Sequence, residues 1–214
     1  MDQGVVAEVQ SGLRGYISYS HADVRHVHRL QSHLLALSRG DERVAFWTDA
    51  VIAPGDQWYK KIAGAIETSD VFVVCMSADY LASEFRYHVE WPRILERVRA
   101  SAALVVPVIL RPCMWYGFVD MFQAVPTVQG RVKPVLEWRP QESGFAQAVS
   151  QIAAAMHEHF RHPDRRQPWS PVSATVDLAH AVPFAPADSE KLSPEDIDQA
   201  VKAVIARRTA GSVD

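Results

Sequence analysis

The chain lacks the residues and runs that mark several classes of protein. Its 214 residues include only two cysteines, which excludes a disulfide scaffold and a cysteine-rich zinc site. It has no apolar run of the ~18 residues that a membrane span requires, so we expect no membrane contact. Residues 1–12 carry an acid and no long apolar run, which predicts a leader that is not a signal peptide. The formal net charge of −3 gives no reason to expect a nucleic-acid partner.

Common catalytic motifs are also missing. The glycine-rich loops that bind nucleotide phosphates are absent, and so is the GxSxG motif of serine hydrolases. The spacing of the histidines places His26 and His28 on different helix faces, as it does His157, His159 and His162, so we expect no metal site. We expect no cofactor either. A composition that is 48% hydrophobic and 22% charged, with few cysteines, favours a cytoplasmic globular protein.

Apolar segments alternate along the chain between two periods. Short runs of β-branched and aromatic residues indicate strands, and stripes of apolar residues spaced by three and four indicate helices. This alternation predicts an α/β fold, in which a parallel sheet carries helices on both faces. Strands are expected at residues 13–19, 44–47, 71–76, 103–110 and, more weakly, 132–138, and helices at 22–38, 56–67, from 84 onward, near 115–124 and at 142–160.

The stretch at residues 70–96 organises the rest of the chain. Its continuous apolar run at 71–76 predicts a strand buried on both faces, and Ser83 is placed to cap the helix that follows. Glu90 lies near the start of this helix, at the carboxyl edge of the predicted sheet, where ligands bind in open α/β folds. Pro92 lacks the N–H that a helix needs, so we expect a kink that changes how Glu90 points.

The C-terminal part differs in composition from the rest. Residues 161–192 are rich in proline and show no clear period, which predicts a linker along the surface. Residues 193–208 begin with serine, proline and glutamate and carry an apolar stripe, which predicts a last helix. A lone helix of ~15 residues is marginal in water. We therefore expect it to dock on the domain's own surface, on a partner chain or on a further domain.

Four sequence blocks, in order, resemble the TIR domain, in particular its bacterial form. The resemblance covers residues 13–160 and implies a flavodoxin-like sheet of five parallel strands in the order 2-1-3-4-5. The leader, the linker and the last helix lie outside it. The blocks are the opening strand and turn at 16–23, the segment 46–58, the signature Ser77-x-x-Tyr80-Leu81-x-Ser83-x-Phe85-x4-Glu90, and 106–112 followed by Trp115.

The resemblance implies an activity as well as a fold. Many TIR domains that keep this glutamate are NADases, which hydrolyse NAD between nicotinamide and ribose to give ADP-ribose or its cyclic form. Others only assemble signalling complexes, and bacterial members often act in antiviral defence. The resemblance thus implies NAD as substrate, Glu90 as the catalytic residue, and homotypic TIR–TIR contacts. It also implies that self-association activates the enzyme by ordering the loop at about 48–57.

The chemistry of that reaction suits a single carboxylate. Nicotinamide in NAD is a cationic pyridinium and leaves as a neutral molecule, so no general acid has to protonate it. What remains is a positive charge that develops on the ribose, and one nearby carboxylate can stabilise it. The competing interpretation of Glu90 is a solvated acid on a helix surface, which is the usual environment of glutamate.

Other residues are expected to contact the substrate, but several have structural alternatives. Ser20 and Asp23 fit a capping box, and Trp58 lies on the apolar stripe of its helix. Asp23 alone is poor support for a receiver domain, a weaker alternative with the same fold. The expected substrate contacts are Tyr19, Ser20, Asp49, Trp58, Ser83 and Arg86.

Arg86 leaves the choice between two functions open. It lies one helical turn before Glu90, where it can bind a phosphate of NAD or pair with Glu90 and compete with the substrate. The rival function is a non-catalytic interaction module. A Glu90 carboxyl that is locked to Arg86, with no room for a dinucleotide, would favour that module over an enzyme.

Overall fold

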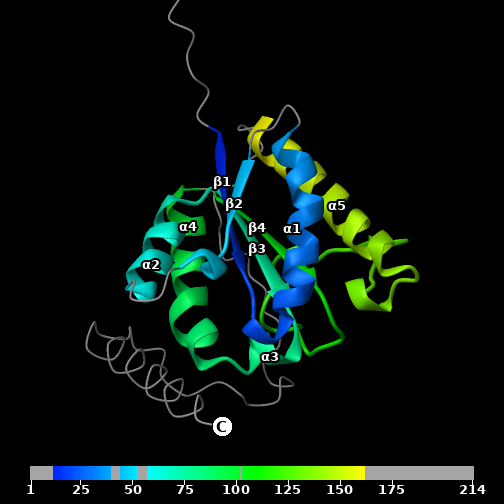
Figure 1. Cartoon of the computed structure of the whole chain (residues 1–214), viewed down its shortest axis with the longest axis horizontal. Coiled ribbons are helices and arrows are strands. Elements are labelled where there is room, and N and C mark those ends of the chain that lie inside the picture. Colours follow the sequence, from blue (N-terminus) through cyan, green and yellow to red (C-terminus); the bar gives the residue numbers. More distant parts are fainter. Residues whose placement is uncertain (1–11, 40–43, 53–56, 102, 162–214) are drawn as a thin grey trace, which may run out of the picture.

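The computed structural model describes residues 12–39, 44–52, 57–101 and 103–161 (Figure 1). The leader apart from Gly12, the linker apart from Arg161, and the C-terminal helix predicted at 193–208 lie outside the described residues. Among the described residues one sheet has four parallel strands in the order β2-β1-β3-β4. The strands are β1 (Leu13–Ser18), β2 (Val44–Trp47), β3 (Val71–Met76) and β4 (Leu104–Ile109).

Helices cover both faces of this sheet, as the sequence predicts (Figure 1). Helices α1 (Val24–Ser38) and α5 (Gln141–Arg161) lie on one face, and α2 (Trp58–Thr68) and α4 (Trp91–Ser101) lie on the other. None of the described helices is both long enough and apolar enough to cross a bilayer. The shorter elements are η1 (His21–Asp23), η2 (Asp49–Val51), α3 (Ala78–Leu81), η3 (Arg86–Glu90), η4 (Val135–Glu137), and a hairpin of β5 (Thr127–Val128) and β6 (Arg131–Val132).

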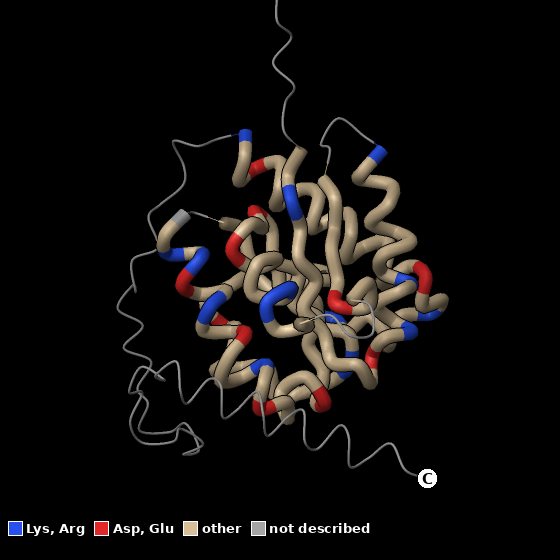
Figure 2. The backbone as a smooth tube through the Cα atoms, turned by 60° about the vertical axis from the view of Figure 1, so that its left-hand side comes forward, with Lys and Arg blue, Asp and Glu red and all other residues tan. Residues whose placement is uncertain are grey.

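Strand β3 is the centre of the core. All six of its residues are buried, because a helical layer covers each of its faces. Val71, Val73 and Cys75 pack into the cluster that α1 and α5 complete, and Phe72 and Val74 pack into the cluster of α2 and α4. Most charged residues lie on the helices and connecting segments (Figure 2). The continuous apolar run therefore predicts the position of β3 correctly.

The expected fifth strand at 132–138 is wrong. Only the first residue of this segment, Val132, lies in the hairpin strand β6, and three of the others form η4, so neither extends the four-stranded sheet. Pro134 explains the difference, because it has no N–H for a sheet ladder and stands immediately before η4. The Leu136 N–H still donates to the Leu110 carbonyl oxygen at 3.0 Å, so one hydrogen bond ties this segment to the end of β4.

Two other local predictions also fail. The helix expected near 115–124 is a series of turns, and Gly117 has a φ of 82°, which a right-handed helix does not allow. The capping box is wrong because Ser20 makes no side-chain cap bond. Asp23 is instead fully buried, where it accepts a hydrogen bond from Ser77 Oγ at 2.5 Å and pairs with Arg111 at 2.7 Å. A long-range interaction thus replaces the local one.

A surface ion pair links the two helices of one face and predicts a pH dependence. The carboxylate of Glu142, at the start of α5, accepts hydrogen bonds from Arg29 and His33 of α1, which lower its pKa from 4.5 to about 2. The stabilisation is thus present above pH 4.5 and lost as the pH falls towards 2. Glu142→Gln is expected to lower the urea midpoint slightly at pH 7, with a difference from the wild type that shrinks below pH 4.5. Glu96→Gln, at an exposed position on α4, is the control, and a pH-independent difference would contradict the assignment.

Candidate active site

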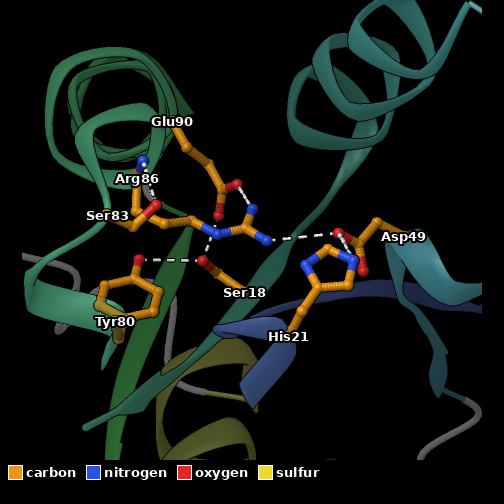
Figure 3. Close-up of polar contacts among 7 residues, drawn as sticks. All are labelled: Ser18, His21, Asp49, Tyr80, Ser83, Arg86 and Glu90. Carbon is orange, nitrogen blue, oxygen red and sulfur yellow. Dashed lines mark hydrogen bonds and ion pairs between the residues drawn. The ribbon is translucent and has the colours of Figure 1, made fainter. Parts of the chain in front are cut away.

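A π-helical turn places Glu90 at the carboxyl edge of the sheet. The turn η3 spans Arg86–Glu90, and α4 restarts at Trp91. The Trp91 N–H bonds to the carbonyl oxygen of Arg86, five residues back, and Pro92 follows without an N–H of its own. This wide turn corresponds to the irregularity expected at Pro92. It directs Glu90 towards Ser18 at the end of β1 (Figure 3), and such turns are frequent at functional sites.

The Glu90 carboxylate is completely buried and held by two side chains. Its side chain has 0% exposure. One oxygen, Oε2, accepts a hydrogen bond from Arg86 Nη1, and the other, Oε1, accepts one from Ser18 Oγ. Ser18 is the last residue of β1, and Arg86 lies one turn before Glu90 in the same helical segment. Two elements that are distant in sequence thus meet at one carboxylate.

Arg86 lies between two carboxylates. Its Nη1 bonds to Glu90, and its Nη2 bonds to Asp49 Oδ2 at 3.2 Å (Figure 3). The Arg86 side chain is 5% exposed and that of Asp49 is 9% exposed, so the network is largely shielded from water. His21, on η1, contacts the same Asp49 oxygen at 3.5 Å and is half exposed. We call the ion pairs of Arg86 with Glu90 and Asp49 the Arg86 latch.

Tyr80 extends the network behind Ser18. Its hydroxyl lies 2.9 Å from Ser18 Oγ, and both residues are buried. Burial raises the pKa of Tyr80 to about 12, so the phenol keeps its proton at neutral pH. Tyr80 belongs to α3, a one-turn helix where the sequence predicts a loop. Ser77 caps this helix by accepting a hydrogen bond from the Tyr80 N–H at 3.1 Å.

The other expected contact residues lie near this network, but none of them forms a hydrogen bond or an ion pair with Glu90 in the described structure. Tyr19 is buried, and its pKa is raised by burial and then by the neighbouring Asp49 carboxylate. Ser83 Oγ accepts a hydrogen bond from the Arg86 N–H at 3.4 Å, as expected of a helix cap. Trp58, the first residue of α2, packs edge-on against Phe85 at 4.9 Å between ring centroids.

Ser20 differs from the other expected contacts. It is half-buried, and its carbonyl oxygen accepts the Asp23 N–H at 2.8 Å. The structure records no contact between Ser20 and the Glu90 network. The geometry therefore brings Asp49, Arg86 and Glu90 together directly, and places Tyr19, Trp58 and Ser83 in the next layer.

Sequence reasoning missed three members of the network, namely Ser18, His21 and Tyr80. Ser18 stands two positions before Ser20, the expected cap residue, and has the sequence context of an ordinary strand residue. Tyr80 belongs to the signature around Glu90, but nothing in the sequence states which atom its hydroxyl meets. The available signal was the parallel sheet, because the ends of β1 and β3 are neighbours in register, with Ser18 opposite Val74.

The described conformation is closed to a ligand at Glu90. A carboxylate without exposed surface, paired with a guanidinium, cannot approach a sugar ring until the pair opens. The pairing that the sequence analysis names as a competitor of the substrate is therefore present. Burying such an ion pair generally adds little net stability compared with apolar side chains, so stability alone is a weak explanation for this arrangement.

Comparisons with known proteins agree with this architecture. A family model described as "TIR domain" matches residues 16–136. The "Uncharacterized protein y4lF" of Sinorhizobium fredii (strain NBRC 101917 / NGR234) is 31% identical over 171 residues, which cover 80% of this chain and 51% of that protein, so the chain spans about half the length of this curated relative.

A solved structure gives a weaker match, with 17% identity and a TM-score of 0.39 over 92% of this chain and 99% of the other. It is titled "Structure of the activated Roq1 resistosome directly recognizing the pathogen effector XopQ (TIR domains)". The family match over residues 16–136 includes β2, β3, β4 and the last three residues of β1. It also includes all members of the Glu90 network. On this evidence the chain belongs to the TIR domain family.

Proposed function

We propose that this TIR domain is an NAD glycohydrolase in which Glu90 is the catalytic residue. The observation that supports the proposal is the placement of the Glu90 carboxylate at the carboxyl edge of a parallel sheet, within a network of polar side chains from four elements. Ligands bind at this edge in open α/β folds. Members of the family either cleave NAD or act as scaffolds, and this placement supports the first of these two functions.

The proposed reaction needs one carboxylate and water. The bond between the ribose anomeric carbon and the pyridinium nitrogen breaks, and its electron pair neutralises the departing nicotinamide. The anionic Glu90 stabilises the positive charge left on the ribose. Water then attacks that carbon and loses a proton, which gives ADP-ribose, or the adenine attacks and gives the cyclic product. No proton has to be supplied to the leaving group.

The Arg86 latch has to open for this reaction, and Asp49 supports a way for it to do so. Arg86 can keep its ion pair with Asp49 when it withdraws from Glu90, so no guanidinium is left buried without a partner. Asp49 begins η2, at the start of the loop at about 48–57 that self-association orders in the family. We propose that homotypic TIR–TIR contacts reposition Asp49 and draw Arg86 away from Glu90.

The other residues expected to contact the substrate are proposed to line the opened site. Trp58 and Tyr19 are proposed to supply aromatic surface beside the opened site, and Ser20 and Asp49 are proposed as further substrate contacts. Ser83 and Arg86 are the proposed contacts to the substrate on the side of the helix. We further propose a role in bacterial antiviral defence through depletion of NAD, a cytoplasmic location, and a partner or further domain for the segment 193–208.

A non-catalytic interaction module is the second candidate, and a specific observation favours it. Glu90 has no exposed surface and is locked to Arg86. A cavity of about 580 Å³ lies elsewhere, between β4, the segment 121–130 and α5, and does not include Glu90. If the latch never opens, the domain has only its surfaces for function, and the Glu90 network is structural.

The two candidates differ in one measurement. We expect the intact chain to release free nicotinamide from NAD, with a rate per chain that rises with protein concentration as assembly opens the latch. The assay measures nicotinamide over a range of protein concentrations, with and without a crowding agent. A constant rate per chain would contradict the gating by assembly. No release at any concentration would contradict the enzyme and leave the interaction module.

A further inference from the structure

We propose that Ser18 and Tyr80 form a positioning pair that keeps the Glu90 carboxylate in place once Arg86 has withdrawn. This inference deepens the proposed NAD cleavage and rests on it. Two consecutive hydrogen bonds link three buried groups, from the Tyr80 hydroxyl to Ser18 Oγ and on to Glu90 Oε1 (Figure 3). They come from α3, β1 and the π-helical turn.

The chemistry of the three groups fixes the direction of the hydrogen bonds. An ionised carboxylate only accepts, so the single hydroxyl proton of Ser18 is donated to Glu90. The oxygen of Ser18 then accepts from the Tyr80 hydroxyl, which lies 2.9 Å away and keeps its proton. Each donor is satisfied in this one arrangement, and Tyr80 thereby holds Ser18 in the rotamer that serves Glu90.

The two oxygens of Glu90 are therefore held in different ways. Oε2 is held by Arg86, which has a second carboxylate, Asp49, to receive it. Oε1 is held by Ser18, whose other hydrogen-bond partner among the described residues is the neutral Tyr80 hydroxyl and not a second carboxylate. Opening the latch thus frees one oxygen for the ribose and leaves the other fixed.

A carboxylate with one oxygen held in place stabilises the positive charge on the ribose better than a carboxylate that can rotate. It needs no reorientation when charge develops on the ribose, and a donor to its second oxygen keeps it in the anionic form. Ser18 and Tyr80 touch Glu90 and one another rather than the reacting atoms, so they are positioning residues.

Ser18→Ala is expected to lower kcat for nicotinamide release ~10- to 100-fold, the rate equivalent of one hydrogen bond to a charged group. Tyr80→Phe is expected to lower it ~2- to 10-fold, because it removes a neutral hydrogen bond one step away. The value of KM should change little in both. The acid limb of the pH–kcat profile should move to higher pH in Ser18→Ala, which a loss of folded protein would not cause.

Matched controls are available in the same core. Ser69→Ala removes a buried serine whose hydroxyl donates to the Ala65 carbonyl oxygen at 2.7 Å, at the end of α2. Tyr59→Phe removes a hydroxyl from a half-buried tyrosine of α2 that accepts a hydrogen bond from Arg93 at 2.5 Å. Both should leave kcat and the pH profile unchanged, and thermal melting compares the four variants for folding.

The outcomes separate the inference from the proposed function. An unchanged kcat and pH profile in Ser18→Ala, with turnover in the wild type, would overturn the positioning pair and leave the enzyme. If Ser18→Ala does not fold, an unchanged kcat in Tyr80→Phe overturns the pair in the same way. If neither the wild type nor Arg86→Met releases nicotinamide, the enzyme and the positioning pair fail together.

Discussion

Replacing Glu90 by glutamine is expected to lower the rate of nicotinamide release ~100-fold or more. Glutamine has nearly the same shape but no negative charge, so it loses the stabilisation of the positive ribose in the transition state, a term of this size in other enzymes. Arg86 keeps Asp49 as its ionic partner, the amide oxygen can still accept from Arg86, and the amide N–H₂ can donate to Ser18 Oγ. The fold should therefore remain, as circular dichroism can verify.

The matched control for this variant is Glu84→Gln. Glu84 lies six residues before Glu90, and its side chain is 72% exposed. Its carboxylate lies 3.3 Å from His88 Nε2. Glu84→Gln should retain the wild-type rate of nicotinamide release, because the solvated Glu84 carboxylate lies outside the Glu90 network and does not contact the substrate. Equal turnover in wild type and Glu90→Gln would refute the catalytic role of Glu90 directly.

Replacing Arg86 by methionine is expected to destabilise the protein by about 3–5 kcal/mol. Methionine fills much of the space of the arginine stem, but it leaves the Glu90 carboxylate buried without a charged partner. The free energy of unfolding, measured by urea titration at pH 7, tests this expectation. Arg93→Met is the control, because Arg93 pairs with a tyrosine and not with a buried carboxylate. Its guanidinium carbon lies 5.1 Å from the centre of the Tyr59 ring, and its Nη2 donates to the Tyr59 hydroxyl at 2.5 Å.

The double variant Arg86→Met with Glu90→Gln identifies the cause. If the cost comes from the orphaned carboxylate, removing its charge should recover a large part of the lost stability, and the two changes will be strongly non-additive. Additive losses would instead indicate that Arg86 acts through packing alone. The single variant Arg86→Met also distinguishes two roles of Arg86, when NAD turnover is measured on the folded protein. If Arg86 blocks Glu90, the variant should turn NAD over faster than the wild type. If Arg86 binds a phosphate of NAD, the variant should have a higher KM for NAD.

The sequence predicts those parts of the site that depend on local spacing. Arg86 and Glu90 are four residues apart on one helical segment, so their pairing follows from helix geometry alone. The apolar run at 71–76 and the irregularity at Pro92 are local signals of the same kind. All three correspond to what the structure shows.

What the sequence does not predict depends on partners that are distant in the chain. Ser18 meets Glu90 across 72 residues, and Asp49 meets Arg86 across 37, so no spacing rule connects them. Asp23 shows the same effect in reverse, because its local pattern with Ser20 gives way to a long-range bond with Ser77. The failed strand at 132–138 is different in kind, since an edge strand has few core neighbours that fix its register.

The π-helical turn has a consequence for how this segment can change in evolution. It contains one residue more than an α-helical turn, so deleting a residue between Arg86 and Glu90 would restore a regular helix and change the spacing of this pair from four residues to three. Arg86 would then approach Glu90 from a different position on the turn. The number of residues in this segment is therefore as constrained as their identity, and insertions or deletions should be confined to the loops on either side.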